Sequence, residues 1–322
     1  MNKTKILEKI TDLSSKYSAT GQDLYSYLDG LLISDYINYW NYINLETLLS
    51  IQQPKTDFPD ENIFIIYHQI TELYFKLCLL ELEQINENGR LVLPSGEDKG
   101  WNKKINVNLF IEKMIRLNRY FKNLIDSFEI MINGMEKDQF LKFRMALLPS
   151  SGFQSAQFRM MELRSTQLSF LTNTKKSLKN PQYKNIYWKS GANEMKTGTK
   201  TYTLKQFEKK YDPELIKLST KMKGKNLLEK YLSLSKKDQA NSQLVNLLKE
   251  YDYNFNIHWK LAHYKSAAKY LKIKNKRVAA TGGTNWEEYL PPRFQKIIFF
   301  PNLWSKEERN QWGRKWVESI NI

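Results

Sequence analysis

The sequence predicts an all-α protein, a helical bundle that forms a single large domain over residues 1–322. Two observations predict this class. Apolar residues recur with a helical period along most of the chain, and the alternation typical of strands is nearly absent. Because no linker clearly separates two apolar cores and no internal repeat is visible, we expect one domain rather than two.

The first half of the chain carries the strongest helical patterns. In the longest of these helices, Pro59 and the acidic residues Asp60 and Glu61 lie at the positive end, and Asp60 or Asn62 can cap it. The cluster at 86–89 contains Asn and Gly and ends it. We expect helices at residues 5–17, 24–36, 44–51, 60–86, 106–132, 136–147 and 153–171.

The second half is interrupted by a polar stretch. Residues 172–202 are basic and rich in Asn, Thr and Gly, which predicts a long loop. This loop opens a basic, loop-rich excursion from the bundle over about residues 172–235. Helical patterns return at about 204–231, 236–250, 252–272 and 305–318.

The charge balance is strongly basic, with 50 Lys and Arg against 34 Asp and Glu, a formal net charge of +16. Residues 171–230 supply +10 of this charge, from 15 basic and 5 acidic residues. Charge concentrated in one polar segment is typical of a solvated surface, so we predict no nucleic-acid partner. The alternative is a non-enzymatic helical protein that binds nucleic acid through residues 171–230.

The cysteine count and the N-terminus indicate a cytoplasmic protein. Cys78 is the single cysteine, which excludes an intrachain disulfide and a metal site made of several cysteines. The first residues are charged and lack the apolar region of a secretory signal. No stretch reaches the roughly 20 apolar residues that cross a bilayer, so we expect no membrane association.

The motifs of the common enzyme classes are missing. The sequence has no glycine-rich phosphate loop, no zinc-protease motif and no convincing serine nucleophile motif. His258 and His263 lie five residues apart, which on a helix places them roughly 140° apart, too divergent to hold one ion together. An apolar helical protein of this kind either has no chemistry of its own or depends on a bound cofactor.

Two residue pairs at helical spacing are candidate site residues. Phe64 and His68 share one helix face, and so do Phe140 and Arg144. Each pair has two interpretations: His68 is either a core histidine or an imidazole directed into a pocket, and Arg144 is either a surface residue or a fork for a substrate carboxylate.

Three further strings can serve a ligand. Ser150 or Ser151 can cap the helix that follows Gly152. The small residues Ala267 and Ala268, one turn beyond His263, leave room for a flat macrocycle or for close helix packing. Thr281 precedes Gly282-Gly283, which permits a mobile loop over a ligand or an ordinary connector.

Taken together, these strings resemble the tryptophan 2,3-dioxygenase family. The resemblance runs from about Tyr39 to Trp304 and is dense at 39–43, 64–73, 143–159 and 259–263 and at Thr281-Gly282-Gly283 with Tyr289-Leu290. The string Ser-Ser-Gly-Phe-Gln-Ser-Ala-Gln-Phe-Arg at 150–159 is long and highly specific.

The resemblance implies a cofactor, haem b, with His263 as the axial ligand of its iron. It also implies that Ser150, Ser151 and Gly152 contact the cofactor and that His68 is the active-site histidine near the indole N–H of the substrate. Phe64 and Phe140 correspond to the walls of the indole slot, Arg144 to the carboxylate-binding arginine and Thr281 to the loop threonine. Tyr39 and Tyr42 correspond to tyrosines that reach a neighbouring subunit's pocket in the family's homotetramer.

The implied activity is the opening of the pyrrole ring of L-tryptophan by insertion of both atoms of O2, which gives N-formyl-L-kynurenine, the first step of tryptophan catabolism by the kynurenine pathway. A related haem oxygenase that acts on another indole or aromatic amino acid is the alternative. This sequence departs from the family pattern at Trp40, at Tyr74, at Lys260 beside Trp259, and in the spacing between His263 and Thr281.

Overall fold

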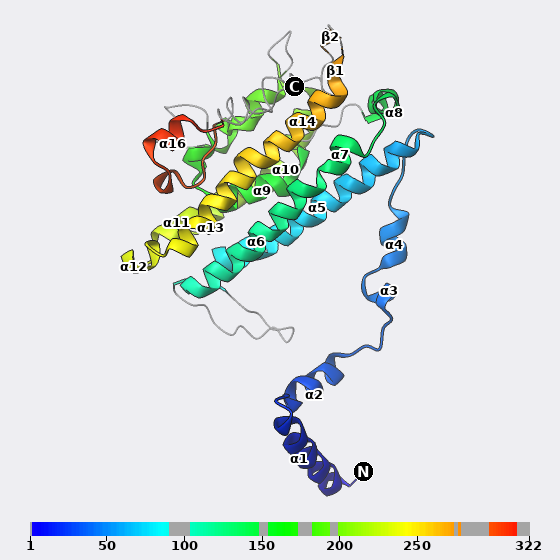
Figure 1. Ribbon diagram of the computed structural model, residues 1–322, viewed down its shortest axis with the longest axis vertical. Helices are drawn as coiled ribbons and strands as arrows, with labels where there is room; N and C mark the ends of the chain where they lie inside the picture. Colours follow the sequence, from blue (N-terminus) through cyan, green and yellow to red (C-terminus); the bar gives the residue numbers. More distant parts are fainter. Residues whose placement is uncertain are drawn as a thin grey trace. The chain divides into compact units, whose positions relative to one another are not determined.

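The computed structural model describes residues 2–89, 104–147, 154–172, 182–193, 199–273, 276–277 and 296–313. It divides into two compact units, Met1–Gln53 and Pro54–Ile322, each with its own contacts (Figure 1). Helices account for nearly all regular structure in the described part, which confirms the all-α class. The prediction of one domain over the whole chain stays a prediction.

The N-terminal unit consists of four helices without a core. None of its described residues is buried, although many are large and apolar. Side chains at the caps start the first two helices: Asn2 accepts from the Thr4 amide, and Asp23 accepts from the amides of Tyr25 and Ser26. The helices are α1 (Lys3–Ala19), α2 (Leu24–Ile33), α3 (Tyr39–Tyr42) and α4 (Leu45–Ser50).

The second unit is a helical bundle whose long members follow a common direction (Figure 1). The helix α5 packs on α6 and α9, and α13 packs on α6. Its helices are α5 (Pro59–Asn86), α6 (Val107–Ser127), α7 (Glu129–Asn133), α8 (Lys137–Phe143), α9 (Ala156–Ser165), α10 (Tyr202–Lys221), α11 (Leu227–Leu232), α12 (Lys236–Gln239), α13 (Ser242–Tyr253), α14 (Trp259–Leu271) and α16 (Lys306–Asn310).

The start of α5 differs from the expected cap. Phe58 occupies the cap position and makes no capping bond, and Pro59 begins the helix, so Asp60 and Asn62 are not caps. Asp60 instead accepts a bond from the Glu136 amide, 2.6 Å. Glu61 accepts from the amides of Lys55 and Thr56, both 2.8 Å. The first-turn carboxylates therefore fix neighbouring segments to the helix end rather than cap it.

By length and composition, α5 is the one helix among the described residues that passes as a candidate membrane span. Its contacts with α6, α9 and α11 are those of a core helix in a bundle. One side of α5 nevertheless stays open, with apolar residues at helical spacing exposed there: Ile66, Ile70, Leu73, Leu77 and Leu80.

The pattern predicted at 106–132 forms two helices. Asn106 caps α6 through the amides of Asn108 and Leu109, and the broad apolar face is buried as expected. The helix ends at Phe128, whose ring is buried, and α7 then continues to Asn133. Similarly, α13 and α14 are joined by one π-helical turn at Asn254–His258. A π turn adds a residue to the helical turn and rotates the residues that follow it.

The predicted loop at 172–202 is wrong for part of its length. Two 3₁₀ helices, Tyr183–Asn185 and Tyr187–Ala192, lie within it, and the side chains of Tyr183, Tyr187 and Trp188 are buried. The aromatic residues bury enough apolar area to outweigh the polar composition around them.

Some basic residues of this excursion are paired with acidic ones. Lys189 contacts Glu208 at 3.0 Å and Asp212 at 2.5 Å, and Lys200 contacts Glu208 at 2.7 Å. Lys221 contacts Glu87 at 3.1 Å. These ion pairs weigh against an open cationic surface for nucleic acid in the described part of the stretch.

The C-terminal segment is attached to the bundle through Asp252. The carboxylate of this buried residue accepts from the amides of Phe299 (2.9 Å) and Phe300 (3.1 Å) and from the Trp304 indole, 2.9 Å. Beyond it, α16 is shorter than the predicted helix at 305–318, whose last residues lie outside the described part. A short hairpin of β1 (Lys272–Ile273) and β2 (Lys276–Arg277) follows α14.

Candidate functional site

The helix α5 places Phe64 and His68 as the sequence predicts. Their ring centroids lie 4.1 Å apart. The Nδ1 of His68 lies 2.7 Å from the carbonyl oxygen of Phe64, one turn earlier. A carbonyl oxygen only accepts, so Nδ1 carries the proton and Nε2 is left as a bare acceptor.

The protein surroundings of His68 affect its ionisation. Its side chain is exposed, yet protein atoms around it are close enough that desolvation lowers the pKa of the imidazole. The bond to the Phe64 carbonyl and the charge of Glu72 act in the opposite direction. The ring is therefore neutral at neutral pH.

His263 on α14 has the same arrangement. Its Nδ1 lies 3.0 Å from the carbonyl oxygen of Trp259, which again leaves Nε2 bare. Burial lowers the pKa of His263 to about 4, and His68 is near enough to contribute to the lowering. A neutral imidazole with an unprotonated Nε2 is the form that binds a metal ion.

Aromatic rings connect the two histidines. The Phe128 ring lies 4.5 Å from that of His263 and 5.7 Å from that of Tyr67, centroid to centroid. Tyr67 in turn lies 6.2 Å from His68. The two imidazoles thus belong to one apolar cluster that α5, α14 and the end of α6 build together.

A second group of rings extends this cluster from Phe64 toward α8. Phe140 lies 6.4 Å from Phe64, and Phe143 lies 5.9 Å from Phe64. Tyr270, near the end of α14, lies 4.7 Å from Phe140. Such tilted and edge-on contacts are the arrangement in which aromatic side chains hold another flat ring.

Arg144 follows these rings directly. It begins a 3₁₀ helix, Arg144–Leu147, and its backbone amide donates to the carbonyl of Phe140. Only 7 % of the residue is exposed, and burial lowers the pKa of its guanidinium. A guanidinium has a planar fork of N–H donors whose geometry fits a carboxylate.

The structure therefore brings four predicted site residues together. The rings of Phe64, His68 and Phe140 contact one another in sequence, and Arg144 follows at the end of α8. The rings of Tyr67 and Phe128 connect His263 to this group. Tyr39 and Tyr42 belong to the N-terminal unit, where they are 71 % and 74 % exposed. Ser150, Ser151, Gly152 and Thr281 lie outside the described residues.

His258 is separate from this site, as the sequence predicts. Its Nδ1 lies 2.9 Å from the Oδ1 of Asn254, and its ring contacts Tyr253. Among the described residues, no group of three or more His, Cys, Asp or Glu side chains is arranged to hold a metal ion.

The sequence reasoning did not identify the supporting rings. Phe128 stands on the apolar face predicted for residues 106–132, and Trp259 lies one turn before His263 with its ring 4.4 Å away. Both positions could have been found from helical spacing alone. Tyr270 could not be placed in this way, because its contact with Phe140 depends on how α14 crosses α8.

A buried cluster of charges lies beside Lys260. Arg159 and Glu162 form an ion pair at 2.9 Å, and the hydroxyl of Tyr187 donates to Glu162. The Nζ of Lys260 lies 5.2 Å from the centre of the Tyr187 ring and has no hydrogen-bond partner among the residues that the structure describes. Burial lowers the pKa of Lys260 to about 8. Lys260 is thus a second buried cation beside Arg159, whose charge the carboxylate of Glu162 already neutralises.

Comparisons with known proteins agree with this geometry. The family model "Tryptophan 2,3-dioxygenase" matches residues 32–266. The protein named tryptophan 2,3-dioxygenase from Ruegeria sp. (strain TM1040) is 36 % identical over 129 residues, which cover 40 % of this chain and 41 % of that protein. The one from Mus musculus is also 36 % identical over 129 residues, which cover 38 % of this chain and 30 % of that protein. One from Dictyostelium discoideum is 32 % identical over 156 residues, 47 % of this chain and 36 % of that protein. The aligned region covers less than half the length of each of these relatives.

Proposed function

Because the chain belongs to the tryptophan 2,3-dioxygenase family, we propose that it opens the pyrrole ring of L-tryptophan with O2 to give N-formyl-L-kynurenine. The observation that carries this proposal is the pair of neutral histidines, His68 and His263. Each donates its Nδ1 proton to its own helix and presents a bare Nε2 within one aromatic cluster. The cytoplasmic location predicted from the sequence is part of the same proposal.

We propose that haem b is held by Nε2 of His263. The chemistry of this group supports the fit, since its pKa of about 4 keeps the imidazole unprotonated at every physiological pH. The carbonyl of Trp259 fixes the ring orientation and increases its basicity as a ligand. When bound, the haem supplies the activation of oxygen. Ser150, Ser151 and Gly152 are proposed as further cofactor contacts.

The substrate is proposed to lie against Phe64 and Phe140, which bury its flat indole ring. Arg144 binds the substrate carboxylate with a two-pronged, charge-assisted bond, and its burial strengthens that bond by excluding water. Together these contacts fix the position and the orientation of the reacting ring. Thr281 is proposed to contact the ammonium and carboxylate end.

His68 is proposed to accept a hydrogen bond from the indole N–H at Nε2. Its tautomer suits this role, because Nδ1 is already used as a donor to Phe64. Its lowered pKa keeps the acceptor free of a proton at neutral pH. This positioning role needs no proton transfer, and an imidazole at this place can also take the proton if the reaction requires a base.

The family's homotetramer is also proposed for this protein. It is supported by the N-terminal unit, whose helices bury none of their apolar residues, and by the exposed apolar residues of α5. In this assembly Tyr39 and Tyr42 contact the pocket of a neighbouring copy. Both tyrosines are exposed and are therefore available for such a contact.

The deciding experiment is an aerobic assay of the haem-loaded protein with L-tryptophan, followed at the absorbance of N-formylkynurenine. We expect turnover in the wild type. His263→Ala should purify without a Soret band, whereas His68→Ala should keep the band and lose turnover or the fixed orientation of the bound substrate. His258→Ala is the matched control and should keep both. A Soret band at full intensity in His263→Ala, or unchanged turnover in His68→Ala, would reject the corresponding assignment.

A further inference from the structure

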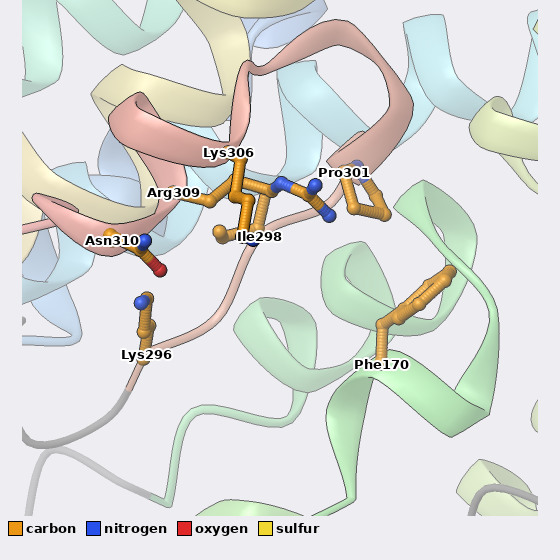
Figure 2. A pocket seen from close by; sticks show the side chains of 7 residues that line it. All are labelled: Phe170, Lys296, Ile298, Pro301, Lys306, Arg309 and Asn310. Carbon is orange, nitrogen blue, oxygen red and sulfur yellow. The ribbon is translucent and has the colours of Figure 1, made fainter.

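An open cavity of about 410 Å³ lies in the second unit, away from the residues of the candidate site. Three segments form it: the 3₁₀ helix Leu168–Leu171, the extended chain around residue 298 and α16 (Figure 2). Its volume lies in the range of about 300–1,000 Å³ that is usual for small-molecule sites. The lining residues are Phe170, Lys296, Ile298, Pro301, Lys306, Arg309 and Asn310.

The charge of this lining is of one sign. Lys296, Lys306 and Arg309 are cations, and no carboxylate is among the lining residues that the structure describes. Figure 2 shows the guanidinium of Arg309 extending from α16 toward Pro301. Lys306 and Arg309 lie three residues apart on α16, where their like charges repel each other, and an anion between them relieves this repulsion.

The helix α16 separates charges by side. Lys306, Arg309 and Asn310 line this cavity, whereas Glu307 and Glu308 line a different one, next to α13. Glu307 is near enough to Arg309 for their charges to interact, but it does not line the cavity. The sequence of α16 therefore directs cations and carboxylates to opposite faces, which a random surface distribution does not require.

The cavity stands on fixed elements. Phe299 and Phe300, which lie between Ile298 and Pro301, are fully buried, and the Thr166 hydroxyl donates to the Phe299 carbonyl at 2.7 Å. The capping box of Ser305 and Glu308 starts α16, and Glu308 contacts Lys249 on α13 at 3.1 Å. The cationic side chains thus project from a framework that is held in place before any ligand binds.

The remaining wall is the half-buried ring of Phe170. An aromatic face beside three cations suits a ligand that combines a flat ring with an anionic group. We propose that this cavity binds a small aromatic anion, whose carboxylate or phosphate lies between Lys306 and Arg309 and whose ring packs on Phe170. This proposal is independent of the function proposed above.

Phenyl phosphate is the probe for the test, because it carries both features. Inorganic phosphate has the charge without the ring, and benzyl alcohol has the ring without the charge. Titration of the full-length protein by calorimetry should show saturable binding of phenyl phosphate, weaker binding of inorganic phosphate and no binding of benzyl alcohol.

Variants then locate the binding. Arg309→Gln and Lys306→Gln should each raise the dissociation constant of phenyl phosphate by about fivefold or more, since each substitution removes one charge-assisted contact. Lys237→Gln, an exposed lysine on α12, is the matched control and should change nothing. Phe170→Leu should remove the preference for phenyl phosphate over inorganic phosphate.

Two results would overturn the proposal. One is the absence of saturable binding by the wild type. The other is an equal loss of affinity in Lys237→Gln and Arg309→Gln, which would show that the anion binds the basic surface in general. The far-UV circular dichroism spectrum of each variant serves as a check on folding that does not depend on this cavity.

Discussion

At the scale of single residues, the backbone decides which nitrogen of a helical histidine stays available. In His68 and in His263, Nδ1 donates to the backbone carbonyl oxygen four residues earlier. Because only Nδ1 is near enough to that carbonyl, the proton is on Nδ1 and Nε2 is unprotonated. The same i and i−4 spacing places Phe64 beside His68 and Trp259 beside His263. The same local geometry on two separate helices therefore leaves Nε2 unprotonated in His68, the proposed hydrogen-bond acceptor, and in His263, the proposed iron ligand.

Arg144→Ala is expected to weaken the binding of L-tryptophan by about 2–5 kcal/mol, the usual cost of breaking a buried charge pair. Tryptamine lacks the carboxylate, so its binding should change little. The measurement is the dissociation constant of each ligand for the haem-loaded protein. Lys142→Ala, an exposed position on the same helix α8, is the control and should bind both ligands normally. Equal losses for the two ligands would count against a carboxylate contact.

Lys260→Met is expected to stabilise the protein at pH 7 by about 1–3 kcal/mol, because it removes a buried cation and leaves the pair of Arg159 and Glu162 intact. The pKa of Lys260 falls to about 8 in the fold from 10.5. Between these values the unfolded chain holds the proton and the folded chain does not, so wild-type stability should rise with pH from about 8 to 10.5.

The difference between Lys260→Met and the wild type should therefore shrink as the pH approaches 10.5. Urea unfolding at pH 7 and pH 10 measures this change. Lys237→Met, at an exposed position, should show no such dependence on pH. A less stable Lys260→Met at pH 7 would mean that the lysine contributes more through its contacts than its burial costs.

At the scale of elements, helical periodicity predicted most of the α-helices and placed Phe64 and His68 one turn apart on α5, whereas Arg144 follows the end of α8 and begins a 3₁₀ helix. The ends were less predictable. Asp60 and Asn62 look like caps in the sequence, but Pro59 starts the helix. The carboxylate of Asp60 instead accepts a hydrogen bond from the amide of Glu136, which is distant in the sequence. A bond between residues so far apart in the chain leaves no local pattern.

The packed aromatic residues in the basic excursion were missed for a related reason. Tyr183, Tyr187 and Trp188 are too few and too close to form a periodic pattern, and the residues around them are polar. Arg159 and Lys189 contact the rings of Trp188 and Tyr183, which adds to the free energy gained by burying them. Periodicity detects faces that repeat along one helix, and not rings that pack singly against other elements.

Asp252→Ala tests how the C-terminal segment is fixed to the bundle. The substitution leaves the buried amides of Phe299 and Phe300 and the Trp304 indole without their acceptor. We expect a loss of stability of about 2–4 kcal/mol, since each buried donor left unpaired costs about 1–3 kcal/mol and part of the segment can rearrange. Urea unfolding gives the change, with Asp138→Ala at an exposed position of α8 as the control. A loss below that of the control would show that the anchor lies elsewhere.

At the scale of the whole molecule, the homotetramer proposed above would account for the distribution of apolar surface over the described residues. The second unit has a continuous core, and yet α5 exposes a row of apolar side chains at the spacing of a helix–helix contact. The N-terminal unit has apolar side chains and no core at all. A folded monomer does not commonly leave such surfaces open, and association with further copies would cover them.

The double variant Leu73→Glu and Leu77→Glu tests this arrangement. Both residues are exposed in the single chain, so the charges should leave its fold intact. In an assembly that buries this side of α5, the same charges would be buried without partners, at a cost of several kcal/mol. We therefore expect the wild type to form an oligomer and the variant to show the mass of one chain, 38.3 kDa, by light scattering after size-exclusion chromatography.

Ile216→Glu is the matched control, because Ile216 is an exposed apolar residue on α10 that does not belong to the row on α5. It should keep the oligomeric mass. If the proposed contact of Tyr39 and Tyr42 with a neighbouring pocket holds, the monomeric variant should also keep its haem and bind tryptophan more weakly. An unchanged mass in the double variant would mean that the copies associate through another surface and that the row on α5 has a different role.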